Sequence, residues 1–270
     1  MQELKRGKFY GALERHQEVE GLLLTEATYT HDYVDWHYHE RPYFTFLLAG
    51  ALKETNRQES YHCVSGDLLF HNWQEAHCNH KPPIYTRGFH LELDPIWLES
   101  MGLALLDIEG NRQIQDPLMR WDFFRIYHQF RATHPANTLD VETLICSLLH
   151  RLAKGKFPDY QGVPGWAKQA AEILAEASEE PRSMRELADQ VGVHPVHLSR
   201  DFAKYFGCKP GTYRQRIRLQ RATSQLSHPE ESLTQIAYAA GFADQSHFGR
   251  VCKQALGHSP KQVRRLLATG

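Results

Sequence analysis

Apolar and polar positions follow different periods along this chain, and the change of period predicts two kinds of secondary structure. Between Leu22 and Leu93, short aromatic and β-branched runs are broken by turn residues, as in residues 43–49, which end at Gly50. Many short strands at this spacing are typical of a small β-barrel or jelly roll. From residue 98 onward, apolar positions instead recur every three or four residues, which indicates helices. We therefore expect an α+β protein with its strands first and its helices after them.

One helix of the middle segment is expected over residues 138–155. Its apolar positions lie three or four residues apart on a single face, and the helix is expected to end at Gly155; the positions are Val141, Leu144, Ile145, Leu148, Leu149 and Leu152. Such a face can pack on the strands or against the same helix of a second copy in a homodimer. The pattern leaves both interpretations open.

A Pro- and Gly-rich run follows this helix and predicts a linker between two domains. Residues 157–165 read Phe-Pro-Asp-Tyr-Gln-Gly-Val-Pro-Gly, a composition typical of loops. A chain of 270 residues is also long enough for two domains. We place the first domain at residues 1–157, the linker at 158–165 and the second domain at 166–270.

The second domain contains one helix-turn-helix pattern twice, at about residues 183–206 and 232–256. Both copies start with a capping box, Ser-x-x-Glu at residues 183–186 and Ser-x-x-Gln at residues 232–235. The first helix of each copy then ends at a glycine, Gly192 or Gly241, which can adopt the left-handed conformation at no steric cost. The second helix follows after a tight turn, and in such motifs it enters the major groove of DNA.

This repeat resembles the AraC/XylS family of bacterial transcription regulators, from about Trp166 to Leu267. Two positions depart from the family pattern, Cys252 where an aromatic residue is usual and Val263 where tyrosine is usual; both remain apolar. The residues that carry the resemblance are Glu186, Leu187, Ala188, Gly192, His197–Phe202, Gly207, Pro210, Tyr213, Arg218, Ala222, Ile236, Ala237, Gly241, Phe242, Asp244–Phe248, Arg250, Gly257, Ser259 and Pro260.

The resemblance implies which side chains read DNA bases. In the first copy they are Val196, Ser199 and Arg200, and in the second copy they are Gln245, Ser246 and Arg250. Arginine can bond guanine as a fork, glutamine can bond adenine, and valine can touch the methyl group of thymine. The alternative for Arg200 and Arg250 is a solvated helix surface or a phosphate contact. Asp244 is expected to cap the second reading helix rather than to read a base.

Positive charge is concentrated in the same part of the chain. Residues 181–270 contain 14 Lys or Arg and 6 Asp or Glu, a net charge of +8, whereas the whole chain has a net charge of −1. Between the two copies, Arg214, Arg218 and Arg221 recur at helical spacing on one face. We expect these three residues to contact DNA phosphates, which would make binding strongly dependent on salt. The alternative for each of them is a solvated basic surface.

The first domain resembles a cupin over about seventy residues. The features that carry this resemblance are His37-x-His39, Gly50, Gly66 with Asp67, and His77. The resemblance implies a small β-barrel with an internal pocket, whose tentative effector-binding residues are His37, His39, Tyr43, Trp73 and His77.

The same histidines could hold a divalent metal ion. His37 and His39 point to one face of a strand, and with His77 they would offer three imidazoles, a set that suits zinc, copper or iron. Tyr43 stands where cupin enzymes have their metal-binding glutamate, and Asn72 and Gln74 replace the usual proline and glycine. The histidines either bind a metal or line a pocket for an organic effector; no cofactor is certain.

Together these patterns predict a sequence-specific transcription regulator switched by a small molecule or a metal, and not an enzyme. The expected partners are double-stranded DNA, RNA polymerase, an effector and a second copy of the chain. The alternatives are a metal-dependent cupin enzyme with a DNA-binding tail, and a DNA-repair methyl acceptor, which would need a zinc-held cysteine. The five cysteines are scattered, and the chain has no apolar run of membrane-spanning length. We therefore expect a cytoplasmic protein without a structural disulfide.

Overall fold

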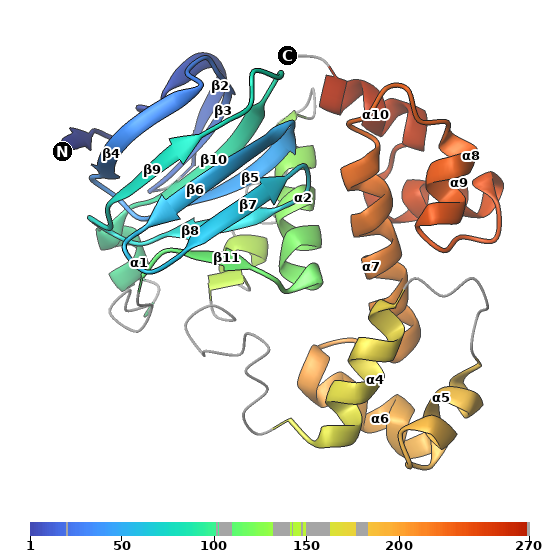
Figure 1. Cartoon of the computed structure of the whole chain (residues 1–270). Helices are drawn as coiled ribbons and strands as arrows, with labels where there is room; N and C mark the ends of the chain where they lie inside the picture. The colour runs from blue at the N-terminus through green and yellow to red at the C-terminus, as the bar shows by residue number, and fades with distance from the viewer. Residues whose placement is uncertain are drawn as a thin grey trace. The chain divides into compact units, whose positions relative to one another are not determined.

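The computed structural model describes residues 1–19, 21–100, 102, 110–131, 141, 143–146, 148–149, 163–176 and 183–268. It divides into two compact units, Met1–Phe157 with Arg264–Gly270, and Pro158–Val263. Strands dominate the first unit and helices make up the second (Figure 1), which confirms the predicted α+β class. The domain limits and linker drawn from the sequence stay predictions, because residues 158–162 of the linker lie outside the described residues. Within the described residues, no helix is long and apolar enough to cross a membrane.

The strands of the described residues form two sheets. One has the strand order β1-β4-β9-β6-β7 and the other has the order β11-β8-β5-β10-β3-β2. Every pairing is antiparallel except that of β1 with β4. The strands are β1 Gln2–Leu4, β2 Gly11–Val19, β3 Leu22–Tyr29, β4 Tyr33–His39, β5 Tyr43–Ala49, β6 Ala51–Asn56, β7 Ser60–Val64, β8 Leu68–His71, β9 His77–His80, β10 Arg87–Leu93 and β11 Arg112–Ile114.

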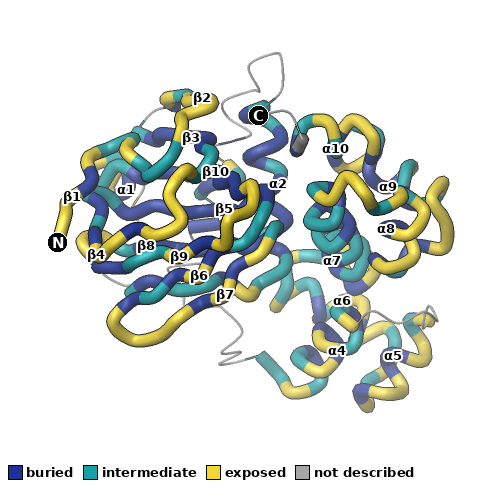
Figure 2. Tube along the Cα trace, turned by 45° about the horizontal axis from the view of Figure 1, so that its top comes forward, coloured by how far each residue is buried: buried dark blue, intermediate teal, exposed yellow. Residues whose placement is uncertain are grey.

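Strand β5 shows why the central strands are apolar along their whole length. All seven of its residues are buried, because successive side chains point to opposite faces and both faces are covered. Phe44 and Phe46 meet Phe123 of helix α2 (Pro117–Arg131), with ring centroids 5.5 and 5.9 Å apart. Tyr43 and Thr45, on the opposite face, line a pocket between the two sheets. Figure 2 shows the resulting contrast between the buried inner strands and the exposed β2.

In place of the expected closed barrel, the described residues form two sheets that face each other. Residues of both sheets line the same pocket, and hydrogen bonds join β5 to β9 and β8 to β6 across the space between them. Within the described residues neither sheet closes on itself. The pocket thus lies between two open sheets, and the cupin resemblance stays a prediction.

The helix expected over residues 138–155 lies only partly within the described residues. Residues 141, 143–146 and 148–149 are helical, whereas Leu152 and Gly155 lie outside the described residues. The buried side chains of this helix are Val141, Ile145, Leu148 and Leu149. Burial within a single chain accounts for much of the apolar face, and the dimer contact stays a prediction.

The second unit is built from short helices packed around apolar side chains. Those most deeply buried include Leu198 and Phe202 in the first copy and Ile236 and Phe248 in the second. Cys252 and Val263, the two departures from the family pattern, are also buried, as expected for packing positions. Besides α2, the helices of the described residues are α1 Pro95–Ser100 in the first unit and, after it along the chain, α4 Gly165–Ala175, α5 Met184–Gln190, α6 Pro195–Phe206, α7 Pro210–Gln225, α8 Leu233–Ala239, α9 Gln245–Leu256 and α10 Pro260–Ala268.

Local chemistry sets the limits of α5 and α8. Both helices begin with the predicted capping box, in which side chain and backbone bond in both directions. Both end at a glycine with positive φ, +70° at Gly192 and +83° at Gly241. The next residue closes the turn, since the amide of Val193 donates to the carbonyl of Ala188 in the first copy, an arrangement typical of a Schellman motif. The two copies therefore share one local design.

Glu92 on β10 is a buried carboxyl whose ionisation opposes folding. The amide of Gly7 donates to its Oε1 at 2.8 Å, yet burial raises the pKa of Glu92 to about 7. Because the folded state holds this proton more tightly than the unfolded state, stability is lost as the pH rises from about 4.5 toward 7 and stays lost above it. Glu92→Gln keeps the acceptor without the charge. Above pH 7.5 it should be more stable than wild type by about 3 kcal/mol, with little difference near pH 4.

Urea denaturation of both proteins between pH 4 and 8 measures this difference. Glu99→Gln, at an exposed position of α1, is the matched control and should show no such pH-dependent gain. A constant offset between wild type and Glu92→Gln at every pH would contradict the prediction.

Candidate functional site

Helices α6 and α9 are the second helices of the two repeats and the candidate DNA-reading elements. All six side chains predicted to read bases are exposed on them: Val196, Ser199, Arg200, Gln245, Ser246 and Arg250. The opposite face of each helix packs on its own subdomain through Leu198 and Phe202 or through Phe248 and Val251. Each helix therefore has one face free for a partner, and the assignment of base contacts stays a prediction.

The start of each reading helix is capped by a different residue. Asp244 caps α9, because the amide of His247 donates to its Oδ1 at 2.6 Å, which confirms the role expected for Asp244. His194 caps α6, where the amide of Val196 donates to its Nδ1 at 3.3 Å, and Pro195 occupies the first helical position. Both caps hold the first turn, where the base-reading residues begin, in a defined conformation.

The two candidate reading arginines differ in their surroundings. Arg200 donates to Asp201 through Nε at 2.9 Å and through a terminal nitrogen at 3.1 Å. Hydrogen bonds from Arg200 and Lys204 hold the pKa of Asp201 well below its usual value. Among the described residues, no hydrogen bond or ion pair involves Arg250. Arg250 is thus available to a partner, whereas Arg200 would have to share its guanidinium with Asp201.

The three arginines of α7 that are predicted to contact phosphate, Arg214, Arg218 and Arg221, are partly buried. Arg221 donates to the carbonyl of Ala175 at the end of α4, where a cation stabilises the last turn of a helix. Arg218 lies against Gly241, since a Cβ added there would come within 3.1 Å of its Nε. Burial lowers the pKa of both Arg218 and Arg221. These two side chains help to join the helices of this unit, and phosphate contacts by Arg214, Arg218 and Arg221 stay a prediction.

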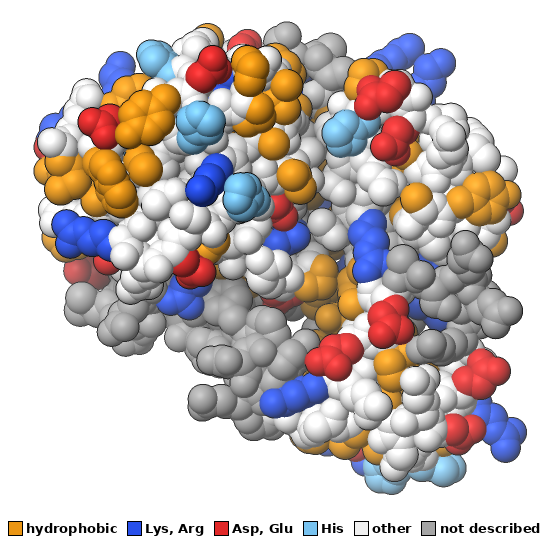
Figure 3. All heavy atoms as spheres, viewed as in Figure 1, with side chains coloured by type: hydrophobic (Ala, Val, Ile, Leu, Met, Phe, Trp, Pro, Cys, Tyr) orange, Lys and Arg blue, Asp and Glu red, His pale blue; other side chains and the backbone are white. Residues whose placement is uncertain are grey.

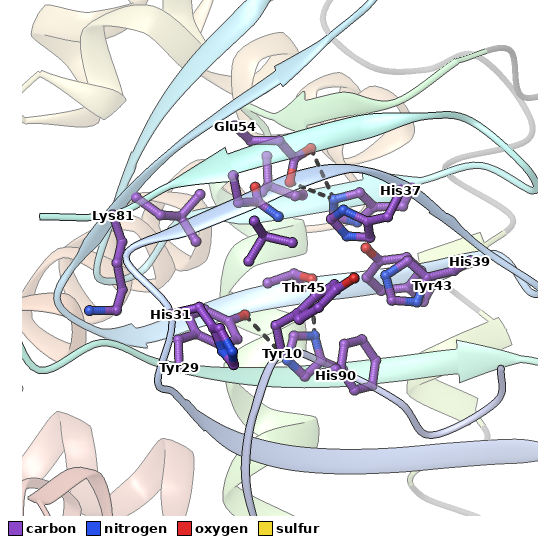
Figure 4. Close-up of a pocket in the computed structure, with 16 residues that line it drawn as sticks. Tyr10, Tyr29, His31, His37, His39, Tyr43, Thr45, Glu54, Lys81 and His90 are labelled. Atoms are coloured by element: carbon purple, nitrogen blue, oxygen red, sulfur yellow. Dashed lines mark hydrogen bonds and ion pairs between the residues drawn. The ribbon is translucent and has the colours of Figure 1, made fainter. Parts of the chain in front are cut away.

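The first unit contains a pocket between its two sheets (Figure 4). It has an empty volume of about 540 Å³, which includes the part open to solvent. Its wall combines aromatic and aliphatic side chains with many ring nitrogens and one carboxylate, the mixture that orients a small molecule in a binding site. The lining residues are Phe9, Tyr10, Tyr29, His31, Val34, His37, His39, Tyr43, Thr45, Leu52, Glu54, Leu69, His71, Asn79, Lys81 and His90.

The fold brings together the three predicted metal-binding histidines. One ligand atom each from His37, His39 and His77 lies within 4.8 Å of the others. His37 and His39 share a face of β4, and His37 pairs directly with His77 of β9. Tyr43, from the facing sheet, contacts His77 Nε2 through its hydroxyl at 3.2 Å. Of the five predicted effector-binding residues, His37, His39 and Tyr43 line the pocket, and His77 lies beside them without being part of its wall.

Trp73 does not join them. It follows the end of β8, its side chain is 55% exposed, and it is not part of the pocket wall. The backbone reverses at this point, with Gln74 at a φ of +58°, and the turn places the indole outside the sheets.

One residue at the pocket was missed from the sequence, Glu54 of β6, and the sequence favours a pocket or surface position rather than a metal-binding role for its neighbour, His71 of β8. His71 Nε2 lies 2.9 and 3.0 Å from the two carboxylate oxygens of Glu54. Together with His77 they form a second group whose ligand atoms lie within 4.8 Å of one another. The sequence could have pointed to Glu54, because side chains alternate between the two faces of β6 and Glu54 is two residues from the apolar Leu52. Both residues are therefore on the same face, and both are buried. His71 ends a strand in which all the other residues are apolar, so the sequence does not indicate which face of the strand its side chain is on.

Protonation at the pocket favours neutral histidines. Burial lowers the pKa of His77 and of His90 to about 3, and burial lowers the pKa of His39 well below its usual value. Burial alone would raise the pKa of Glu54, but the charges of His71 and His77 and the hydrogen bond from His71 lower it overall. Near neutral pH His39, His77 and His90 are thus neutral imidazoles, the form that binds metal ions.

The comparisons with known proteins concern mainly the second unit. A family model described as "Helix-turn-helix domain" matches residues 187–266. The transcriptional activator RhaS of Escherichia fergusonii is 34% identical over 82 residues, which are 30% of this chain and 30% of RhaS. RhaS of Escherichia coli O9:H4 (strain HS) is 36% identical over 78 residues, 29% of this chain and 28% of that protein. The chain thus matches about three tenths of the length of these relatives.

Solved structures give weaker likenesses. A transcriptional regulator with an AraC-type DNA-binding domain from Chromobacterium violaceum is 30% identical, with a TM-score of 0.36, and the match covers 40% of this chain and 97% of that one. ToxT from Vibrio cholerae O395 is 13% identical with a TM-score of 0.39, over 93% of this chain and 100% of that one.

The assignment rests on residues 187–266 and on the duplicated, capped repeat within them. The repeat was predicted from its residues, its helices lie where the pattern placed them, and the matched relatives are transcriptional activators of the helix-turn-helix type. Residues 187–266 are therefore a helix-turn-helix domain that is similar to the DNA-binding domains of AraC/XylS-family regulators.

Proposed function

We propose that this protein is a sequence-specific transcription regulator controlled by an effector that binds between the sheets of its first unit. The observation that carries the proposal is the duplicated helix-turn-helix. Each copy presents one apolar face to its own subdomain and leaves the candidate base-reading side chains exposed.

DNA binding would proceed through α6 and α9. Val196, Ser199 and Arg200 would read one stretch of major groove, and Gln245, Ser246 and Arg250 would read another. The net charge of +8 over residues 181–270 would attract the phosphate backbone and speed the search for a site. Arg214, Arg218 and Arg221 would contribute to that attraction, with Arg218 and Arg221 also joining helices within the domain.

The effector would be a small polar or aromatic molecule in the pocket, with His37, His39 and Tyr43 as contacts and His77 bonded to the Tyr43 hydroxyl beside them. The pocket offers ring nitrogens and hydroxyl groups for hydrogen bonds and aromatic faces for stacking. A metal ion on His37, His39 and His77 is the other occupant that these residues suit. Either occupant would act only by binding two arrangements of the protein unequally. We propose a homodimer, acting on RNA polymerase in the cytoplasm, as the functional form.

The test of DNA reading is Arg250→Ala. A binding site is first selected from a pool of random duplexes with the wild-type protein. If Arg250 forks onto a guanine, the variant should bind that site about 1 to 3 kcal/mol more weakly and bind random duplexes almost as well as wild type. Fluorescence anisotropy at fixed salt measures both affinities.

Lys253→Ala is the matched control, because Lys253 is exposed on the last turn of the same helix. It should weaken all duplexes alike or none. Equal losses on selected and random DNA in Arg250→Ala would mark Arg250 as a phosphate contact. Failure of the wild-type protein to select any sequence would overturn the proposed function.

Effector control is tested in the same assay. Small molecules that raise the melting temperature of the protein are added at saturation, and the affinity for the selected duplex is measured again. A bound effector should change that affinity, and substitution of Tyr43 by Phe should weaken the response. Saturating ligands that leave both DNA affinity and oligomeric state unchanged would remove the first unit from the switch.

A further inference from the structure

We propose that Glu54, His71 and His77 bind a divalent transition-metal ion between the two sheets. The three residues come from β6, β8 and β9, so the ion would link one sheet to the other. The sequence suggests a different set, His37, His39 and His77. The two sets share His77, but Glu54 and His71 take the place of the two histidines of β4.

His71 and Glu54 are already close enough to share one ion, and His77 is near enough to reach it by a small movement of its side chain. One atom from each residue lies within 4.8 Å of the other two, and His71 Nε2 lies 2.9 and 3.0 Å from the oxygens of Glu54. Two ligand atoms at metal-binding distance, about 2.1 Å from one ion, are separated by about 3 Å when the angle between them is a right angle. Strand pairing produces the approach, because Asn56 is paired with His77 and Glu54 lies two residues away on the same face.

The unsatisfied groups of this cluster point to a cation. Glu54 is 2% exposed, so its carboxylate must find its partners inside the protein. Its hydrogen-bonding partner among the described residues is His71. His71 is itself 1% exposed, and its Nδ1 is buried without a hydrogen-bond partner. A metal ion between them would bond the carboxylate and the rings directly.

His77 is oriented as metal-binding histidines are. Its Nδ1 lies 3.3 Å from the carbonyl oxygen of Glu75, and because a carbonyl only accepts, this nitrogen carries the proton. Histidines that bind metals usually donate their second nitrogen to a carbonyl or carboxylate in this way. The lone pair is then on Nε2, toward which the hydroxyl of Tyr43 now donates at 3.2 Å. Tyr43 would have to release that bond when the ion binds.

The donor set indicates the class of metal. Two imidazoles and one carboxylate suit Zn²⁺, Fe²⁺ or Mn²⁺, and they do not suit Ca²⁺ or Mg²⁺, which prefer oxygen ligands throughout. The set also carries a negative charge. His37, His39 and His77 offer three neutral rings, so a divalent ion bound there would keep its full charge in a buried space. We therefore assign the ion to the group that contains Glu54.

Zinc binding to untagged, chelator-treated protein tests the assignment without DNA. We expect about one Zn²⁺ per chain, measured by competition with a chromophoric chelator. Glu54→Gln and His71→Asn should each weaken binding by more than about 100-fold, beyond the loss typical of an outer partner. His39→Asn is the matched control and should change the affinity by less than about 10-fold, and Tyr43→Phe should leave it unchanged or tighter.

Cobalt-loaded wild-type protein gives a readout that does not depend on whether the variants fold. Two histidine ring N–H signals shifted by the paramagnetic ion would support the assignment to Glu54, His71 and His77, whereas three would place the ion on His37, His39 and His77. The proposal is also overturned if the wild-type protein binds no zinc, or if His39→Asn loses the ion while Glu54→Gln retains it. Because DNA is absent from these measurements, a failure to bind zinc would not affect the proposed DNA-binding function. A failure to bind DNA would likewise not affect the metal assignment.

Discussion

Phe248→Ala is expected to unfold the second helix-turn-helix copy and to abolish DNA binding. Phe248 is fully buried on α9, and its ring centroid lies 5.0 Å from that of Phe242. Removing a buried phenyl ring loses its transfer free energy and leaves a cavity, which together cost about 3 to 5 kcal/mol. A loss of that size is comparable to the whole stability of a small domain. Without α8 beneath it, α9 could not present Gln245, Ser246 and Arg250 together.

Urea denaturation followed by far-ultraviolet circular dichroism measures the first effect, and anisotropy with the selected duplex measures the second. Tyr238→Ala removes another aromatic ring from the same copy, at a position that is 60% exposed, and should change stability by less than about 0.5 kcal/mol. Wild-type stability in Phe248→Ala would mean that α9 does not pack on α8 as the structure has it.

Glu26→Gln is expected to destabilise the first unit by about 3 to 5 kcal/mol, because it leaves a buried arginine without its counter-charge. Glu26 and Arg87 are both fully buried, with Oε1 and a guanidinium nitrogen 3.3 Å apart. Arg131 approaches the other oxygen of Glu26 at 3.2 Å, and the hydroxyl of Tyr127 donates to Oε1 at 3.3 Å. One carboxylate therefore joins β3, β10 and the end of α2.

Denaturation of the variant near neutral pH measures the loss. Glu18→Gln is the matched control, because Glu18 forms an ion pair with Arg6 at 3.0 Å on the surface, where such a pair contributes about 1 kcal/mol or less. Equal effects of the two substitutions would show that water reaches the Glu26 cluster. Substitution of Glu26 and Arg87 together by apolar residues should recover part of the loss, since no uncompensated charge would remain.

Charged side chains on the surface and charged side chains inside the first unit have different expected effects on stability. Figure 3 shows acidic, basic and histidine side chains scattered over one face of the molecule, where single ion pairs contribute little. The charges with large expected effects are those inside the first unit, at Glu26, Glu54 and Glu92, each less than 4% exposed. None of the three was singled out from the sequence; alternation along β6 carried a signal for Glu54, whereas Glu26 and Glu92 lie in strands that are buried on both faces, where alternation gives no signal.

The sequence by itself determined the helix-turn-helix repeat, because everything that defines it is local. A capping box spans four residues, a glycine at the end of a helix acts within one turn, and the apolar spacing of Leu198 and Phe202 fixes which face is buried. The histidines of the first unit were found for a similar reason, since His37 and His39 lie two residues apart on one strand.

Only the tertiary structure decided what surrounds those histidines. Glu54 and His71 reach His77 through the pairing of β6 with β9 and through the facing of two sheets, and strand register depends on contacts between residues far apart in the chain. The same reason explains why Trp73 lies outside the pocket and why Arg221 bonds the end of α4. Short-range patterns determine helices and their ends, whereas the composition of a site between sheets depends on which strands become neighbours.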